Sequence, residues 1–422
     1  MFQKYGTNGK EIDMKTSMVL RPGSAALSNR ALTLRLLFSH GALSRTDIAD
    51  SLEITTAAVT SIVGELLEEG LVVQQAAPEN QNQVGRRRLP LAINYDWRYI
   101  LAIDIHSYYV NIAVTNMRGR VLAEKSLTPA GDTPEALCGG IAAECLKLME
   151  ETQTPPEKVL GAGVTVIGPI NQVDGIALHL FRLFDEPFPI RRYFEEAFPF
   201  PVAVENNVCA ILLSELRFTD ITEEAHNILM LKWGPGVGSA VAIHDHIYKG
   251  YNYQSPEIGH NRVSEKDGLR CNCGQIGCLE PTVSADAIVQ FINEKIASYP
   301  AGGLAALANR IGPPSRKNLS QYLRSDSETL WDFMADRSYA LASVTSNALH
   351  ILSPDKLVLM GDLFELEAVT TLFEQQLYTI NPRLQPGLCV RARASAGKKF
   401  IGAAAIVVEQ VLLPRRDLRT PH

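Results

Sequence analysis

Apolar residues recur at helical spacing in three short segments between Ser28 and Gly70. The first segment places Leu34 and Leu37 on one face, a pattern that predicts a helix with one buried side. The next two segments repeat this amphipathic pattern over shorter lengths. No clear periodicity precedes Ser28, so residues 1–27 are expected to form a flexible arm.

Polar caps separate the second and third helices by only a few residues. Ser44 and Asp47 have the spacing of a capping box at the start of the second helix. Thr55 or Thr56 can cap the third helix. Two short helices joined by a tight turn are typical of the helix-turn-helix plan, which predicts DNA binding. The start of the third helix offers small hydroxyl and methyl groups as candidate base contacts: Thr55, Thr56, Ala57, Thr60 and Ser61.

A β-hairpin is predicted directly after the third helix. Leu71–Val73 and Leu89–Ile93 are apolar, and a polar loop separates them. The return of this hairpin carries three consecutive arginines within reach of phosphates or a narrow minor groove: Arg86, Arg87 and Arg88. Residues 28–95 are therefore interpreted as a winged helix-turn-helix domain that binds a double-stranded DNA operator. A three-helix protein-interaction module is the alternative.

Charge and composition are compatible with this organisation. The 422-residue chain has a net charge of −6, whereas residues 1–95 carry ten basic against nine acidic residues. A neutral first domain with a local basic patch, attached to an acidic body, is compatible with nucleic-acid binding. Neither a run of eighteen apolar residues nor an apolar leader occurs. The sequence therefore predicts a cytoplasmic protein without a membrane segment, associated with the nucleoid when bound to DNA.

Beyond residue 95 the pattern changes to that of buried strands. Three short apolar runs joined by tight turns begin at Tyr99, and a helical segment follows near Thr133–Glu151. Another apolar strand, Val159–Val166, comes next, and a comparable series of strands starts again at His226. This repeated order resembles the duplicated plan of sugar kinases, in which two lobes clasp sugar and nucleotide.

One histidine and three cysteines lie within nineteen positions of one another: His260, Cys271, Cys273 and Cys278. This is the ligand set of a closed tetrahedral zinc site, and it leaves no position open for a catalytic water. One structural Zn²⁺ per chain is therefore predicted, with a reduced, metal-free cysteine cluster as the alternative. The remaining cysteines are expected to be core residues and not a disulfide framework: Cys138, Cys145, Cys209 and Cys389.

The segment from Glu257 to Glu280 resembles the signature of the ROK family (repressors, open reading frames and sugar kinases). Its Glu-x-Gly-His motif ends at His260, and Glu280 follows the cysteine cluster. The winged helix ahead of it is similar to that of the xylose-repressor and N-acetylglucosamine-repressor branch. The resemblance implies an α/β chain, with the winged helix-turn-helix followed by a two-lobed actin-like (ribonuclease H-like) sugar-kinase fold. The lobes are expected at residues 96–205, joined by a C-terminal helix at about 402–422, and at 206–401.

The resemblance also implies which residues contact a sugar: Asn206, Asn207, Glu257, His260 and Glu280. Pyranose hydroxyls both donate and accept hydrogen bonds, so carboxylates and amides can bind them in pairs. His260 would place one ring nitrogen on zinc and the other on the sugar. Support of the metal without ligand contact is the alternative for Glu257 and Glu280.

The sequence departs from the kinase pattern at the phosphate-binding loops. Kinases of the family carry two glycines and a threonine after the aspartate that corresponds to Asp104. Here that run is His106-Ser107-Tyr108, whose side chains obstruct the close backbone approach that phosphate needs. Pro235 removes a hydroxyl and an N–H from the second loop.

Two further departures concern charge and basicity. The family's catalytic base is an aspartate, and Asn207 stands in its place. An amide cannot accept the proton of the attacking hydroxyl. Asp362 replaces a glycine near the nucleotide and would repel phosphate. Sugar binding is thus expected to be retained, and phosphoryl transfer lost.

The sequence predicts a sugar-responsive DNA-binding repressor of carbohydrate metabolism or uptake, and not an enzyme. The expected effector is a sugar or sugar phosphate, and the expected assembly is a homodimer or homotetramer on a palindromic operator. One alternative is a bifunctional ATP-dependent sugar kinase. Another is a repressor with a vestigial pocket that is controlled by a protein partner, such as a component of a sugar phosphotransferase system.

Overall fold

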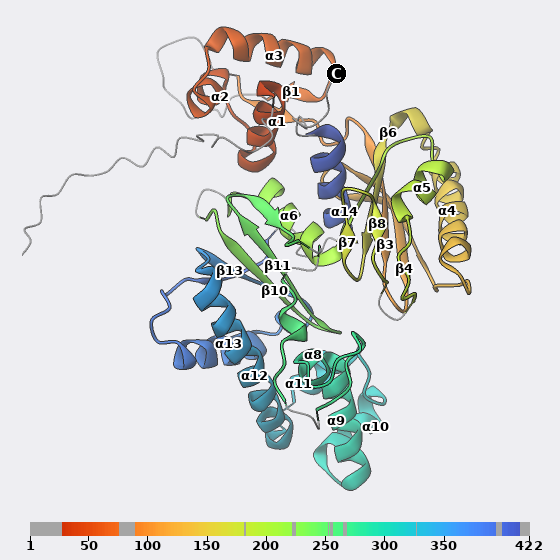
Figure 1. Cartoon of the computed structure of the whole chain (residues 1–422), viewed down its shortest axis with the longest axis vertical. Coiled ribbons are helices and arrows are strands. Elements are labelled where there is room, and N and C mark those ends of the chain that lie inside the picture. Colours follow the sequence, from red (N-terminus) through yellow and green to blue (C-terminus); the bar gives the residue numbers. More distant parts are fainter. Residues whose placement is uncertain are drawn as a thin grey trace, which may run out of the picture. The chain divides into compact units, whose positions relative to one another are not determined.

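Figure 1 shows the computed structural model of the chain. The structure describes residues 28–75, 89–180, 183–221, 225–251, 253, 256–264, 268–325, 327–393 and 399–413. The expected N-terminal arm, the wing arginines Arg86, Arg87 and Arg88, and the last nine residues of the expected C-terminal helix lie outside these ranges. The chain divides into two compact units, one up to Asn94 together with residues from Leu413, and the other Tyr95–Leu412.

The described part of the first unit holds three helices and a two-stranded sheet: α1 (Asn29–His40), α2 (Arg45–Leu52), α3 (Thr56–Glu68), β1 (Val72–Gln74) and β2 (Leu91–Ile93). β1 and β2 pair antiparallel, as the hairpin prediction requires. Its core contains fully buried side chains from all three helices, among them Leu34, Ile48 and Val63. The predicted capping box of α2 is confirmed, because the Asp47 N–H donates to Ser44 Oγ and the Ser44 N–H donates to Asp47 Oδ2.

The first lobe of the second unit is a five-stranded sheet in the order β5-β4-β3-β6-β9. Its strands are β3 (Tyr99–Ile105), β4 (Val110–Asn116), β5 (Val121–Leu127), β6 (Val159–Val166) and β9 (Val202–Asn206). The helices α4 (Pro134–Glu151) and α5 (Ile190–Ala197) cover one face. The short elements of this lobe are η1 (Pro156–Lys158), β7 (Ile170–Asn171) and β8 (Ile176–Ala177).

The C-terminal helix α14 (Ile401–Val407) packs on the other face of this sheet and continues as a π-helical turn, Val408–Leu412. Small residues allow a close approach, since a Cβ on Gly163 would lie 2.2 Å from the Ala403 carbonyl oxygen. The segment Ile401–Leu412 therefore completes the first lobe.

The second lobe is a five-stranded sheet in the order β12-β11-β10-β13-β14. Its strands are β10 (Ile228–Trp233), β11 (Val237–Ile243), β12 (His246–Tyr248), β13 (Lys356–Met360) and β14 (Cys389–Arg391). Its helices are η2 (Ile258–His260), α8 (Glu280–Val283), α9 (Ala285–Ser298), α10 (Gly303–Ile311), α11 (Leu319–Leu323), α12 (Glu328–Leu352) and α13 (Glu367–Ile380). Within the described part of the chain, none of the helices combines the length and hydropathy needed to traverse a bilayer.

The helix α6 (Asn207–Phe218) belongs to both lobes. It starts directly after β9 of the first sheet, and its Leu212 and Leu216 pack against β10 and β11 of the second. Arg217 of α6 also makes a buried, bidentate ion pair with Glu409 (2.7 and 3.1 Å). The residues at the start of α6 are thereby held where the two lobes meet.

Candidate functional site

A cavity of about 260 Å³ lies between the two lobes. This is near the lower end of ordinary ligand pockets, which span about 300–1,000 Å³. Its walls come from the loop after β3, the junction of β9 and α6, the loop before β11, and the segment around the cysteines. All residues that the sequence suggests for sugar contact line this cavity: Asn206, Asn207, Glu257, His260 and Glu280.

The four predicted metal ligands come together at one edge of the cavity. Their ligand atoms, one each from His260, Cys271, Cys273 and Cys278, all lie within 4.8 Å of one another. Gly274 and Gly277 adopt positive φ angles of 87° and 84°, which turn the chain back between the cysteines.

The spacing of these atoms fits a tetrahedral zinc ion. Zn–S bonds of about 2.3 Å and Zn–N bonds of about 2.0–2.1 Å imply ligand atoms roughly 3.6–3.8 Å apart. Cys271 Sγ is 3.5 Å from His260 Nδ1, and Cys273 Sγ is 3.7 Å from Cys278 Sγ. The cluster can therefore hold a metal ion, and all of its ligands come from this segment.

His260 faces both the cluster and the cavity. Its Nδ1 points to the sulfur atoms, whereas its Nε2 lies 3.6 Å from Glu257 Oε2. A metal on Nδ1 would leave a proton on Nε2, which could then donate to a ligand in the cavity.

Two carboxylates stand on the same wall as His260. Burial raises the pKa of Glu257 to about 7, and the neighbouring Glu280 adds to this rise. Glu280 Oε2 accepts the Val237 N–H (3.0 Å), so this carboxylate lies against the glycine-rich loop before β11. A Cβ on Gly236 would stand only 2.6 Å from that oxygen, which explains the glycine there.

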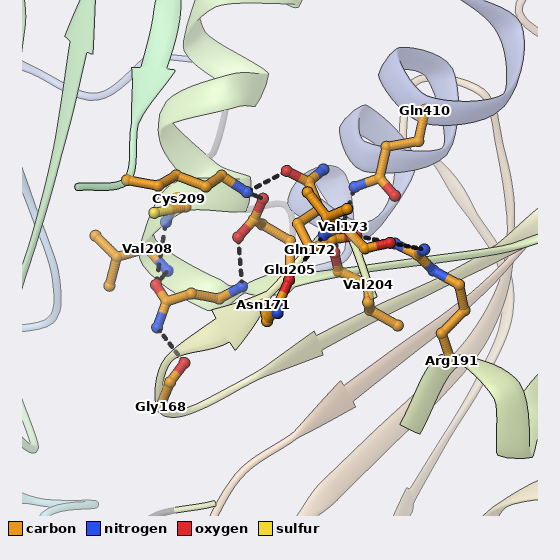
Figure 2. Close-up of polar contacts among 12 residues, drawn as sticks. Gly168, Asn171, Gln172, Val173, Arg191, Val204, Glu205, Val208, Cys209 and Gln410 are labelled. Atoms are coloured by element: carbon orange, nitrogen blue, oxygen red, sulfur yellow. Dashed lines mark hydrogen bonds and ion pairs between the residues drawn. The ribbon is translucent and has the colours of Figure 1, made fainter. Parts of the chain in front are cut away.

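Asn206 and Asn207 differ in how much of their side chain remains for a ligand. Asn206 is the N-cap of α6, where its Oδ1 accepts the N–H groups of Val208 (2.9 Å) and Cys209 (3.2 Å). Its Nδ2 donates to the Gly168 carbonyl, also seen in Figure 2. Asn206 thus has one N–H left to offer, whereas Asn207, the first residue of α6, has no such capping bonds and lines the cavity at 8% exposure.

A contact between the lobes contributes to the lining of the cavity and was not anticipated from the sequence. The Lys249 ammonium, beyond β12, donates to Glu205 Oε2 at the end of β9 and to Gln172 Oε1. Figure 2 shows Gln172 and Glu205 side by side at this contact. The second Glu205 oxygen accepts the Asn206 N–H (2.9 Å). The Lys249 and Glu205 side chains are only 17% and 6% exposed.

Replacing Lys249 by methionine is expected to destabilise the protein strongly. The change leaves the Glu205 carboxylate buried without its counter-charge, a loss that typically costs about 3–5 kcal/mol. Chemical denaturation measures this cost, and Lys249→Met/Glu205→Gln is expected to recover most of it. The control Arg192→Met breaks an ion pair with Glu196 whose side chains are 80% and 65% exposed, and should cost about 0–1 kcal/mol. Equal losses in the two single variants would contradict the role of the buried contact.

Side chains fill the first phosphate loop. Asp104 accepts from the Thr165 hydroxyl (2.7 Å) and lies 2.9 Å from His106 Nε2. The His106 ring stacks on Tyr109 with centroids 4.4 Å apart. Arg316 of the second lobe lies over the Tyr108 ring at 4.7 Å. The side chains of this loop therefore line the cavity.

The first unit presents the start of α3 to solvent. The five candidate base contacts are all exposed: Thr55, Thr56, Ala57, Thr60 and Ser61. Thr55 is the N-cap, since its Oγ1 accepts the Ala58 N–H (3.2 Å), and the Thr60 hydroxyl donates to the Thr56 carbonyl (2.7 Å). Thr56, Ala57 and Ser61 are likewise exposed on the first two turns of the helix.

Comparison with known families assigns both units. Residues 100–410 match the ROK family, which is most of the chain. The chain belongs to the ROK family. Residues 28–84 match the MarR family, in agreement with the winged helix-turn-helix of the first unit. The predicted family and fold class are thereby confirmed.

The known ROK relatives include repressors and kinases. A xylose repressor of Caldicellulosiruptor bescii is 28% identical over 64% of this chain and 66% of its own length. The DNA-binding transcriptional dual regulator NagC of Escherichia coli is 21% identical over 81% of this chain and 82% of its own.

Solved structures share the ROK fold. A ROK family transcriptional regulator, described as a homologue of the E. coli MLC protein, superposes with a TM-score of 0.72 at 21% identity, over 92% of this chain and 96% of its own. A ROK family glucokinase from Streptomyces griseus, solved with glucose and AMPPNP, superposes with a TM-score of 0.62 at 22% identity, over 72% of this chain and 98% of its own. At these identities the likeness concerns the fold alone.

Proposed function

We propose that this ROK-family chain is a sugar-responsive, DNA-binding transcriptional repressor of carbohydrate metabolism or uptake. The observation that carries the proposal is the combination of an exposed recognition helix with a kinase-type cleft in which an amide stands at the position of the family's general base. Asn207 occupies the position of the base, and side chains cover the first phosphate loop. A cleft of this kind can bind a polyol but cannot transfer phosphate to it.

In the proposed mechanism a sugar binds between the lobes, with its hydroxyls on Asn207, Glu257, Glu280 and His260. Asn206 contributes at most one N–H, because its amide caps α6. Binding would favour one arrangement of the lobes and so change the affinity for a palindromic operator, which a homodimer or homotetramer would span. Effective coupling requires that the sugar bind the two arrangements unequally.

Zinc is the metal that best fits the His260 and cysteine cluster. The spacing of the ligand atoms supports this assignment, as does the ligand chemistry of three thiolates and one imidazole. The ion would be structural, and its role would be to hold the Glu257–Glu280 wall in place and to fix the tautomer of His260. The protein would act in the cytoplasm and on the nucleoid.

A second candidate function is a bifunctional ATP-dependent sugar kinase, favoured by the fold shared with glucokinase. We expect no ATP turnover above background with any sugar, either by the native protein or by Asn207→Asp. Restoring the base alone is insufficient, because His106, Tyr108 and Pro235 still obstruct the phosphates. A coupled ATPase assay with a sugar panel measures this, and sugar-dependent turnover by the native protein would establish the kinase instead.

A third candidate is a repressor controlled by a protein, such as a component of a sugar phosphotransferase system. Calorimetry separates it from the proposed function. Intact operator binding by a protein whose cleft binds no sugar would favour this alternative.

A further inference from the structure

The cationic side chains that line the cavity show which class of sugar the site accepts. Among the described lining residues, three carry a fixed positive charge, and all belong to the second lobe: Lys232, Lys249 and Arg316. A phosphorylated effector would need at least one of them to receive its phosphate. Two of them are already paired with carboxylates of the protein, and the charges of two further carboxylates act on the third.

Lys249 and Arg316 make direct charge-assisted hydrogen bonds. Lys249 donates one hydrogen bond to the Glu205 carboxylate and one to the Gln172 amide oxygen. The carboxylate already balances the charge of this ammonium. Arg316 donates through two nitrogens to both oxygens of Asp286, a bidentate pair, while its plane covers Tyr108. Both cations are therefore already held in ion pairs with carboxylates of the protein.

Lys232 lies at the inner end of the cavity. It follows Ile228 and Met230 on the face of β10 that packs against α6, and its half-buried side chain extends past them to the cavity. Burial lowers its pKa, and the charges of Asp104 and Asp362 oppose that effect. The charges of two carboxylates thus act on this ammonium, although burial has the larger effect.

The backbone donors that commonly hold phosphate are occupied as well. In the glycine-rich loop, the Val237 N–H donates to Glu280, and the Gly234 N–H donates to the Gly236 carbonyl (3.0 Å). At the N-terminus of α6, Asn206 accepts two N–H groups. Helix N-termini and glycine-rich loops bind anions through just such groups. In this protein, oxygen atoms of the chain itself already accept these N–H groups.

From these contacts we infer that the cleft accepts an uncharged monosaccharide and rejects its phosphorylated form. This inference rests on the proposed function and specifies its effector. A phosphate ester brings a charge of about −1.5 to −2 at pH 7. In this cleft that charge would meet the carboxylates of Glu280 and Asp362, while Lys249 and Arg316 are already paired. A neutral polyol, in contrast, uses Glu257 and Glu280 as hydrogen-bond acceptors.

Isothermal titration calorimetry on the full-length protein tests the inference. The probes are D-xylose, D-glucose, N-acetyl-D-glucosamine and further pentoses, hexoses and hexosamines, each measured beside its phosphate ester. At least one uncharged sugar is expected to bind, and its phosphate ester should bind at least ~100-fold more weakly, because several carboxylates repel it at short range.

The possible results separate the inference from the proposed function. A phosphate ester that binds as tightly as its parent sugar, or more tightly, would overturn the inference and leave the sugar-responsive repressor standing. Absence of binding by both classes would overturn the inference together with the sugar-responsive part of the proposed function.

A charge variant tests the physical cause. Asp362→Asn removes one of the two carboxylates beside Lys232 and is expected to improve binding of the phosphate ester about tenfold, while the uncharged sugar changes little. The control Asp336→Asn makes the same substitution at an exposed position of α12 and should alter neither affinity. Unchanged discrimination in Asp362→Asn would contradict an electrostatic origin of the selectivity.

Discussion

Replacing Cys278 by alanine is expected to abolish metal binding and with it the sugar response. The buried sulfur of Cys278 lies 3.7 Å from that of Cys273, so its loss removes one of four ligands from a closed site. Structural zinc contributes on the order of 10–16 kcal/mol of binding free energy in small zinc domains, and that energy is folding free energy. The described segment around the cysteines has little other regular structure, only the short helix η2 and isolated β-bridges.

The cavity wall formed by Glu257, His260 and Glu280 is expected to lose its sugar-binding geometry in this variant, because the metal holds these residues in place. His260 offers its Nε2 to the cavity only while its Nδ1 is held at the cluster. Loss of a group that orients such a histidine typically lowers metal affinity or activity 10–100-fold. With Glu257 and Glu280 displaced as well, we expect sugar affinity to fall at least ~100-fold. Metal analysis should give one zinc per chain in the native protein and none in the variant.

The control for this variant is Cys389→Ala. Cys389 is a partly buried thiol of β14 that packs against the core of the second lobe away from the cluster. Its substitution should preserve metal content and sugar affinity. A Cys278→Ala protein that binds sugar as tightly as the native protein would show that the wall does not need a metal.

Introducing a carboxylate on the recognition helix is expected to remove operator binding without harming the fold. Ala57 is exposed in the first turn of α3. A glutamate there is favourable for the helix itself, because a negative charge near the N-terminus interacts well with the helix dipole. In the major groove the same carboxylate would lie close to phosphates and base acceptors, which repel it. Each base contact that is lost weakens the binding free energy by about 1–3 kcal/mol, and this loss occurs at both half-sites.

We therefore expect Ala57→Glu to weaken operator binding by at least ~100-fold, with the sugar affinity unchanged. Fluorescence anisotropy with labelled operator measures the loss. The control Ala306→Glu adds the same charge at an exposed position of α10 in the second lobe and should bind operator almost normally. Equal affinity of Ala57→Glu and the native protein would mean that α3 does not enter the groove.

Local signals in the sequence predicted most of the elements around the site. The capping box at Ser44 and the cap at Thr55 each depend on neighbouring residues, and the structure has both. The cysteine cluster is equally local, since three of its ligands lie between Cys271 and Cys278. Chemistry of this kind is encoded in short spacings, so no knowledge of the fold is needed to find it.

The contacts between the lobes could not be predicted in the same way. Lys249 and Glu205 are 44 residues apart and come from different sheets, so their pairing follows only from the docking of the lobes. Lys232 did give a local signal, because a lone lysine within the apolar strand Ile228–Trp233 is unusual. The capping role of Asn206 could also have been predicted from the sequence, because asparagine at the start of a helix is a preferred N-cap.

The proposed coupling between sugar and DNA is tested most directly by one titration. Operator affinity of the full-length native protein is measured by fluorescence anisotropy with and without a saturating uncharged sugar that calorimetry has shown to bind. Allosteric coupling of about 1–3 kcal/mol predicts that the sugar changes the operator affinity about 5–150-fold. An operator affinity that stays the same while the cleft is saturated with sugar would contradict a sugar-responsive repressor.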